Sequence, residues 1–173
     1  MTPRKPSATE PRLVELPPQR MAVVHARGAP DKVFPTIFPA LYGSVYTLKF
    51  DLKKKGLPTF QVSPPRARYP DAHTAPKDSW TIIIGIPVPM DTVTLPQKVP
   101  GIGVVLETWD YGPSAEILHK GPYDQETESI ERLHRFIQQS GYEIAGVHEE
   151  EYLSRPDAKV LKTMIRYPVK KLA

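Results

Sequence analysis

The chain has 173 residues, of which 40% are hydrophobic and 24% charged, so its length and composition fit one globular domain with a real hydrophobic core. It contains no cysteine, which excludes disulfides, thiolate metal sites and a thiol nucleophile. The formal net charge is +4, but the basic residues are scattered and the tight run at 53–55 fits a helix end better than a phosphate-binding patch. We therefore predict a protein that does not bind nucleic acid directly, and the lack of a long apolar run predicts no membrane span.

Residues 1–19 are rich in proline and poor in apolar side chains, which predicts a loose or partly ordered N-terminal arm. Arg4 and Lys5 are followed by prolines and Glu10 and not by an apolar stretch, so we predict no signal peptide. Together with the absence of cysteine, this favours a cytoplasmic location.

After the arm, the chain repeats one pattern twice. The segment 21–31 (MAVVHARGAPD) resembles 115–124 (AEILHKGPYD), and each ends in an aspartate that is suited to cap a helix. The segment 80–88 (WTIIIGIPV) resembles 161–169 (LKTMIRYPV) in the same way. The sequence thus predicts repeat one at about 20–98 and repeat two at about 103–173.

In repeat one, Pro35 and Pro39 interrupt the start of a helical pattern, so we expect a helix over about 40–55 that begins late or is kinked. Strands are predicted at 59–63 and 80–88. The β-rich segment 103–109 is expected to form or extend the join between the repeats.

In repeat two, apolar residues at helical spacing predict a helix over about 125–140, with Asp124 as N-cap and Gly141 in the left-handed conformation at its end. Strands are predicted at 143–153 and 160–168. The fold class is therefore α+β. We expect two βαββ repeats with pseudo-twofold symmetry, a joined antiparallel sheet with both helices on one face, and a ligand cleft between the repeats.

Several motifs in this order resemble the GyrI-like family: 42–50 (YGSVYTLKF), 117–124 (ILHKGPYD), Gly141 with Tyr142, and above all 148–156 (HEEEYLSRP). The resemblance covers nearly the whole chain after the arm and implies a single GyrI-like domain at 20–173. It implies a fold like that of the effector-binding domains of multidrug-responsive regulators, here with no DNA-binding segment, and it assigns the family's pocket acid to Glu150.

Some stand-alone members of this family are hydrolases that open strained cyclopropane rings. Their pattern often has paired tryptophans where this chain has 65–70 (PRARYP), so that part of the aromatic cage is missing here or rebuilt from Tyr69. If the protein is a hydrolase, Glu150 would orient or deprotonate a water, and Tyr152 would donate a hydrogen bond to the oxygen that gains charge.

A strand over 143–153 places His148, Glu150 and Tyr152 on one face. Ala145, Val147 and Leu153 then lie on the other face, which we expect to pack against the helices, so that Glu150 points into the cleft. Spacing alone leaves a second interpretation open, in which the three glutamates at 149–151 form a solvated strand end. A further group of aromatic residues is expected to line the site: Tyr42, Tyr46, Trp80, Trp109 and Tyr111.

These features predict the binding of small hydrophobic or cationic aromatic molecules. The alternatives are a hydrolase without cofactor, with Glu150 and Tyr152 as catalytic residues, and a protein-interaction module such as an inhibitor of DNA gyrase, so a protein partner stays open. The five histidines lack metal-ligand spacing, and Gly101 and Gly103 lack the third glycine of a dinucleotide fingerprint. We therefore predict no metal and no cofactor.

Overall fold

The computed structural model describes residues 9–173. They form two compact units. The first unit is Pro18–Asp110, and the second unit combines Tyr111–Ala173 with the segment that ends at Pro17. Each unit is described by itself.

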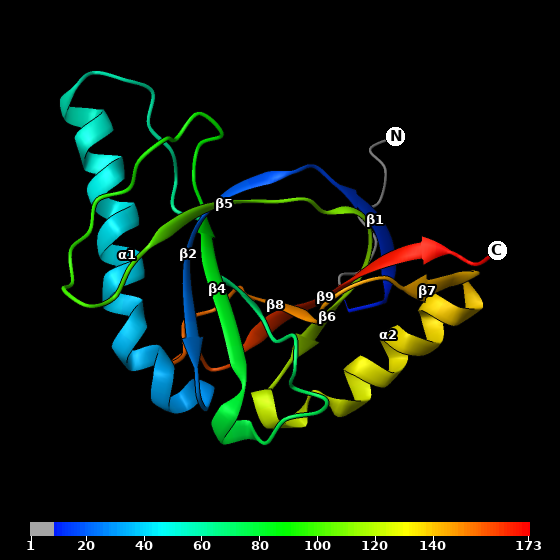
Figure 1. The fold of residues 1–173 in the computed structure, drawn as a ribbon. Helices are drawn as coiled ribbons and strands as arrows, with labels where there is room; N and C mark the ends of the chain where they lie inside the picture. The colour runs from blue at the N-terminus through cyan, green and yellow to red at the C-terminus, as the bar shows by residue number, and fades with distance from the viewer. Residues whose placement is uncertain (1–8) are drawn as a thin grey trace. The chain divides into compact units, whose positions relative to one another are not determined.

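The first unit is an antiparallel sheet with one long helix beside it. Its strands are β2 (Gln19–Arg27), β3 (Arg66–Arg68), β4 (Thr81–Pro87) and β5 (Val105–Trp109), in the spatial order β3-β4-β2-β5. Helix α1 (Pro30–Lys54) packs against β2 and β4, and a short 3₁₀ helix, η1 (Lys77–Ser79), precedes β4 (Figure 1).

Helix α1 begins at Pro30, so the predicted late start was wrong. Pro35 and Pro39 lie inside the helix, where each removes one backbone hydrogen bond. The helix persists because Ile37, Leu41 and Val45 bury one apolar side chain in each successive turn, which offsets the missing bonds.

Two strand predictions for this half of the chain also need correction. Residues 59–63 form no strand, and the short strand β3 lies a few residues further on. Strand β5 pairs with β2, so the segment 103–109 belongs to the first unit. The boundary between the compact units falls after Asp110, and the predicted bounds of the repeats stay a prediction.

The second unit has the same layered construction. Its strands follow the order β1-β6-β9-β8, with β1 at Arg12–Leu16, β6 at Gly112–Lys120, β9 at Lys162–Lys171 and β8 at Glu149–Tyr152. A further strand, β7 (Tyr142–Ile144), pairs with β9. Helix α2 (Thr127–Gln139) follows the 3₁₀ helix η2 (Tyr123–Gln125) and packs against β6 and β7.

The predicted amphipathic helix of this unit is confirmed. Leu133 and Ile137 of α2 are buried against Ile117 of β6 and Ile165 of β9. Gly141 follows the helix with φ +79°, as expected for a left-handed helix end. The start differs from the prediction, because Asp124 lies in η2 and the N-cap position of α2 falls on Glu126.

The expected N-terminal arm is ordered in part, because β1 pairs with β6, and residues 1–8 of that arm lie outside the described residues. The α+β class is confirmed, whereas the βαββ repeat stays a prediction, because β7 stands between α2 and the paired strands β8 and β9 in the second unit. The pseudo-twofold axis and the cleft stay predictions. Among residues 9–173, no helix combines the length and the apolar character that crossing a bilayer requires.

Candidate functional site

Strand β8 determines which glutamate of the 149–151 run faces which side of the second unit. Glu150 is opposite Ile165 in the register, and Glu149 is opposite Arg166. Because side chains alternate along a strand, Glu150 lies on the face that carries Ile165 and is covered by α2, while Glu149 and Glu151 lie on the other face.

The predicted orientation of this strand was therefore wrong. The expected strand 143–153 is divided into β7 and β8, with Gly146 between them. A Cβ atom at Gly146 would lie 2.7 Å from Cγ of Pro168, so the chain can pass this point closely only with glycine there. After the break Val147 and Leu153 are exposed, and the helix-covered face receives His148, Glu150 and Tyr152 in their place.

On the helix-covered face, Glu150 meets a second carboxyl group from Glu126 at the start of α2. The two side chains share a hydrogen bond, and both residues are more than nine-tenths buried. No lysine or arginine within residues 9–173 forms an ion pair with either of them. Two buried carboxyl groups in contact repel each other when both are charged, so a proton on one of them or a positive charge on the nearby His148 imidazole must offset the second charge.

The predicted residues His148 and Tyr152 complete this cluster. The Tyr152 hydroxyl donates to Oε2 of Glu150 at 2.8 Å, and Nε2 of His148 lies 3.3 Å from Oε1 of Glu150. Nδ1 of His148 is hydrogen bonded to the hydroxyl of Tyr167 at 2.7 Å. The ring of Tyr123 meets that of Tyr152 edge to face, with centroids 5.6 Å apart. We call Glu126, His148, Glu150, Tyr152 and Tyr123 the acid–ring cluster.

The surroundings shift the pKa values of the two carboxyl groups of this cluster in opposite directions. Burial, the hydrogen bond to Glu150 and the Glu150 charge raise the pKa of Glu126. Burial also acts to raise the pKa of Glu150, but the hydrogen bonds of His148, Glu126 and Tyr152 and the charge of His148 outweigh it and lower the pKa. The surroundings thus favour the neutral form of Glu126 and the charged form of Glu150. Burial and these nearby carboxyl groups raise the pKa of Tyr167 to about 12.

One oxygen of the cluster has no partner. Among the described residues, Oε1 of Glu126 is buried and accepts no hydrogen bond, and the same holds for Oγ1 of Thr163 in β9. An unpaired buried polar atom costs about 1–3 kcal/mol, and native structures usually satisfy such atoms with water or an ion.

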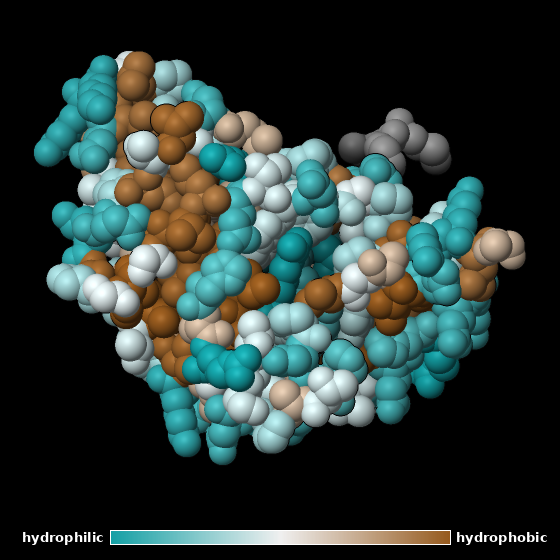
Figure 2. All heavy atoms as spheres, in the orientation of Figure 1, coloured by the Kyte–Doolittle hydropathy of each residue, from teal (hydrophilic) through white to brown (hydrophobic). Residues whose placement is uncertain are grey.

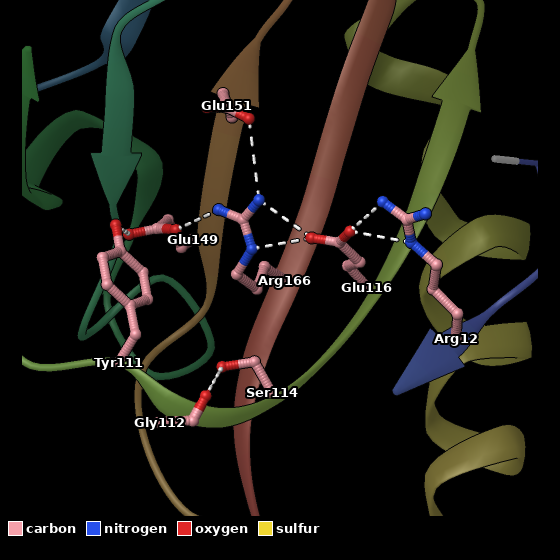
Figure 3. A network of polar contacts seen from close by, with 8 residues as sticks. All are labelled: Arg12, Tyr111, Gly112, Ser114, Glu116, Glu149, Glu151 and Arg166. Carbon is pink, nitrogen blue, oxygen red and sulfur yellow. Dashed lines mark hydrogen bonds and ion pairs between the residues drawn. The ribbon is translucent and has the colours of Figure 1, made fainter. Parts of the chain in front are cut away.

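The opposite face of the same sheet carries a second acidic cluster, which Figure 3 shows. The guanidinium of Arg166 contacts Glu116 at 2.9 Å, Glu149 at 2.6 Å and Glu151 at 3.6 Å. Arg12 of β1 adds a second guanidinium, 2.6 Å from Glu116. We call these five residues the arginine cluster.

Each carboxylate of the arginine cluster has a fixed cation beside it. Desolvation acts to lower the pKa of Arg166, but the charges of Glu149, Glu116 and Glu151 outweigh it and raise the pKa further above its ordinary value. The hydroxyl of Tyr111 donates to Oε1 of Glu149 at 2.8 Å and adds to this network (Figure 3). The arginine cluster ties β1, β6, β8 and β9 together and is structural in character.

The structure brings together three of the predicted site residues, namely Glu150, Tyr152 and His148. Tyr111 donates to Glu149 of the arginine cluster in the same unit. Trp109 and Trp80 belong to the first unit, where Trp109 donates to Glu107 and lies under the guanidinium of Arg68, and Trp80 donates to the carbonyl of Ala75.

The remaining two, Tyr42 and Tyr46, are part of an aromatic row along α1. Their rings stack with centroids 6.3 Å apart, and Phe34, Phe38 and Phe50 continue the row at intervals of four residues. Figure 2 shows hydrophobic side chains gathered over this helix. The residues around Gly28 and Val33 line an open depression in the first unit, and none of the predicted site residues, all of which the structure describes, lines it.

Two members of the acid–ring cluster had other interpretations in the sequence. Glu126 is at a helix start, where a negative charge is favoured by the helix dipole, so its sequence position does not reveal a second role. Tyr123 lies beside a proline in the predicted helix-start motif. Glu116 and Arg166 of the arginine cluster occupy paired positions on the neighbouring strands β6 and β9. Each is a charged residue whose neighbours in the sequence are apolar or aromatic, and this is the signal that the sequence contains.

Comparisons with known proteins agree with this architecture. The chain resembles a crystal structure of a hydrolase from Listeria innocua, with 23% identity, a TM-score of 0.78, and coverage of 94% of this chain and 92% of that one. An uncharacterized conserved protein from Listeria innocua is similar at 24% identity and a TM-score of 0.80, covering 94% and 93%. The EcmrR C-terminal domain is similar at 17% identity and a TM-score of 0.65, covering 94% and 98%.

At these identities the solved structures show a shared fold. No curated protein matches the chain at a significant level. The family model for the GyrI-like small molecule binding domain matches residues 9–170, which span both units and every residue of the acid–ring cluster. The sequence motifs, the α+β fold and this match agree, and the chain belongs to the GyrI-like small molecule binding domain family.

Proposed function

We propose that the protein binds small hydrophobic or cationic aromatic molecules at the acid–ring cluster of its second unit. The observation that carries the proposal is the buried Glu150 carboxylate, which among the described residues has no arginine or lysine beside it. A cation that enters the cluster would pair with Glu150, which at present faces only the His148 imidazole as a possible positive charge. The arginine cluster offers no such opening, because its carboxylates already contact guanidinium groups.

The rings around Glu150 support an aromatic cation as the ligand class. An aromatic face contributes about 0.5–2 kcal/mol to a nearby cation, and Tyr123 and Tyr152 offer two rings at one edge of the cluster. Tyr123 is 44% exposed, so it connects the buried carboxyl pair with the surface. A charge-assisted hydrogen bond to Glu150 adds about 1.5–3 kcal/mol, which together with the two rings corresponds to dissociation constants that range from weaker than millimolar down to about ten micromolar.

A binding experiment tests this proposal with a matched pair of compounds. Naphthylmethylammonium is a protonated aromatic amine, and naphthylmethanol is its neutral analogue. We expect the amine to raise the melting temperature of the wild type in proportion to its occupancy, and the neutral analogue to do so far less. Glu150→Gln should weaken amine binding about tenfold or more, whereas Glu143→Gln, at an exposed ion pair with Lys170, should leave it unchanged. Equal binding of both compounds, or equal binding to both variants, would show that Glu150 is not the anchor.

A hydrolase is the second candidate, and the Tyr152 hydroxyl on Glu150 is the observation that favours it. A carboxylate beside a hydroxyl donor can orient a water and stabilise an oxygen that gains charge. Two similar solved structures, both from Listeria innocua, are described as hydrolases. Catalytic turnover of a cyclopropane-bearing alkylating compound that is lost in both Glu150→Gln and Tyr152→Phe would favour hydrolysis, whereas stoichiometric binding without product would favour the binding function alone.

The remaining proposals rest on fewer observations. A protein-interaction role, such as inhibition of DNA gyrase, rests on the resemblance, and a supercoiling assay with purified gyrase tests it directly. A cytoplasmic location and the absence of direct nucleic-acid binding rest on composition and on the scattered basic residues.

A further inference from the structure

The acid–ring cluster has the donor atoms of a metal centre. Glu126, His148 and Glu150 each present one ligand atom, and these atoms all lie within 4.8 Å of one another. A cluster of acids alone is a common feature of protein surfaces, but this one is buried, and it combines two carboxyl groups with an imidazole. Sequence spacing could not reveal it, because Glu126 stands at the start of α2, whereas His148 and Glu150 lie just before and within β8.

A second observation points to a missing occupant. Oε1 of Glu126 is buried and has no hydrogen-bond partner among the described residues, although Glu126 is only 7% exposed. The carboxyl group is therefore held inside the protein with one oxygen unused. A bound ion satisfies such an oxygen directly.

The spacing between His148 and Glu150 fits shared coordination. Ligand atoms at about 2.0–2.1 Å from a tetrahedral zinc ion are separated from each other by about 3.3 Å. Nε2 of His148 and Oε1 of Glu150 lie 3.3 Å apart. An ion between them would meet both atoms without a change in the β8 backbone.

Hydrogen bonds from neighbouring side chains hold both ligands in place. Nδ1 of His148 bonds to the hydroxyl of Tyr167 at 2.7 Å, which leaves Nε2 directed at the cluster. The hydroxyl of Tyr152 donates to Oε2 of Glu150 at 2.8 Å, which leaves Oε1 directed at His148. Metal-binding histidines and carboxylates in proteins are typically oriented by such bonds.

We propose that Glu126, His148 and Glu150 bind one divalent transition-metal ion of the zinc type, through a carboxylate oxygen of each glutamate and Nε2 of His148. Two carboxylates balance the charge of a divalent ion. The imidazole favours zinc-like ions over magnesium and calcium, which prefer sites made of oxygen atoms alone. With three protein ligands, a fourth position stays open for water or for another molecule.

This proposal does not rest on the small-molecule function, although the two share Glu150. A divalent ion and an aromatic ammonium ion would compete for the same carboxylate. Zinc should therefore reduce the affinity for naphthylmethylammonium, and removal of zinc with a chelator should restore it.

The test uses the full chain after dialysis against a chelator. Calorimetric titration with zinc chloride should give one saturable site per chain. Glu126→Gln and His148→Ala should each weaken zinc binding at least tenfold, whereas His25→Ala, which removes an exposed histidine outside the cluster, should not change it. Cobalt(II) added in place of zinc should give visible absorption bands of a low-coordinate site in the wild type and lose them in Glu126→Gln.

Each result has a defined meaning. Absence of saturable binding, or equal zinc affinity in the wild type, Glu126→Gln and His148→Ala, would overturn the proposal. Urea unfolding in the presence of chelator shows whether each variant is folded, and Glu126→Gln keeps the shape of the side chain if His148→Ala fails to fold. Binding of naphthylmethylammonium in chelator together with no zinc site would refute the metal proposal and leave the small-molecule function standing.

Discussion

The two acidic clusters of the second unit lie on opposite faces of the same short strand, and their buried carboxyl groups have different partners. Glu149 and Glu151 face the guanidinium of Arg166. Glu150, between them in sequence, faces another carboxyl group, that of Glu126. Carboxylates with a fixed cation hold the sheet together, whereas we propose that the carboxyl pair, which has no arginine or lysine beside it, binds a cation from outside.

The arginine cluster should dominate the stability of the unit. We expect Arg166→Met to lower the free energy of unfolding by about 3–5 kcal/mol, because it leaves Glu116, Glu149 and Glu151 buried without their shared cation. Urea denaturation measures this loss. The control is Arg155→Met at an exposed ion pair with Asp157, which should change stability by no more than about 0.5 kcal/mol. If the two substitutions cost the same, the cluster is not a structural centre.

Replacing either of two adjacent glutamates of β8 by glutamine should affect stability differently, because their side chains lie on opposite faces of the sheet. Glu149→Gln should lower the free energy of unfolding by about 1–3 kcal/mol, since Arg166 and Tyr111 lose a charged acceptor. Glu150→Gln should cost less than Glu149→Gln, because the loss of a charged acceptor for Tyr152 and His148 is partly offset by the removal of one of two facing carboxyl groups. Both values come from denaturation curves recorded without ligand. A larger loss for Glu150→Gln than for Glu149→Gln would reverse the assignment of the two faces.

The smallest expected effect concerns Asp71 of the first unit, a carboxylate held by neutral donors. The backbone N–H and the hydroxyl of Thr81 each donate to it at 2.8 Å, and these hydrogen bonds lower its pKa. A lowered folded-state pKa gives stability that is present above the unfolded pKa of about 3.9 and is lost as pH falls through the folded pKa. The stability advantage of the wild type over Thr81→Val should therefore be larger at pH 6 than at pH 2. An advantage that stays constant between these pH values would show that the hydrogen bond does not depend on the Asp71 charge.

The elements that could be predicted from the sequence are those with a strong local signal. The spacing of Leu133 and Ile137 predicted α2, and Gly141 predicted its end. Helix α1 was placed too late because the burial of its apolar stripe, a tertiary effect, outweighs the local effect of Pro35 and Pro39.

The candidate site was predicted only in part, because some of its features are local in the sequence and others depend on tertiary packing. The alternation in 148–152 grouped His148, Glu150 and Tyr152 correctly, since side-chain spacing is a local property of a strand. The side to which they point depends on the close passage of Gly146 over Pro168 and on the pairing of β8 with β9, and neither is local. Glu126 joins the cluster only through the packing of α2 on the sheet.

The location of a bound ligand tests the central claim most directly, namely that the helix-covered face of β8 receives cations while the other face is closed. A crystal structure with naphthylmethylammonium should place the ammonium group within hydrogen-bonding distance of Glu150, with the naphthyl ring against Tyr123 or Tyr152. A ligand bound against Arg166 and Glu149, or a ligand elsewhere with Glu150 still paired only to its present neighbours, would contradict the account.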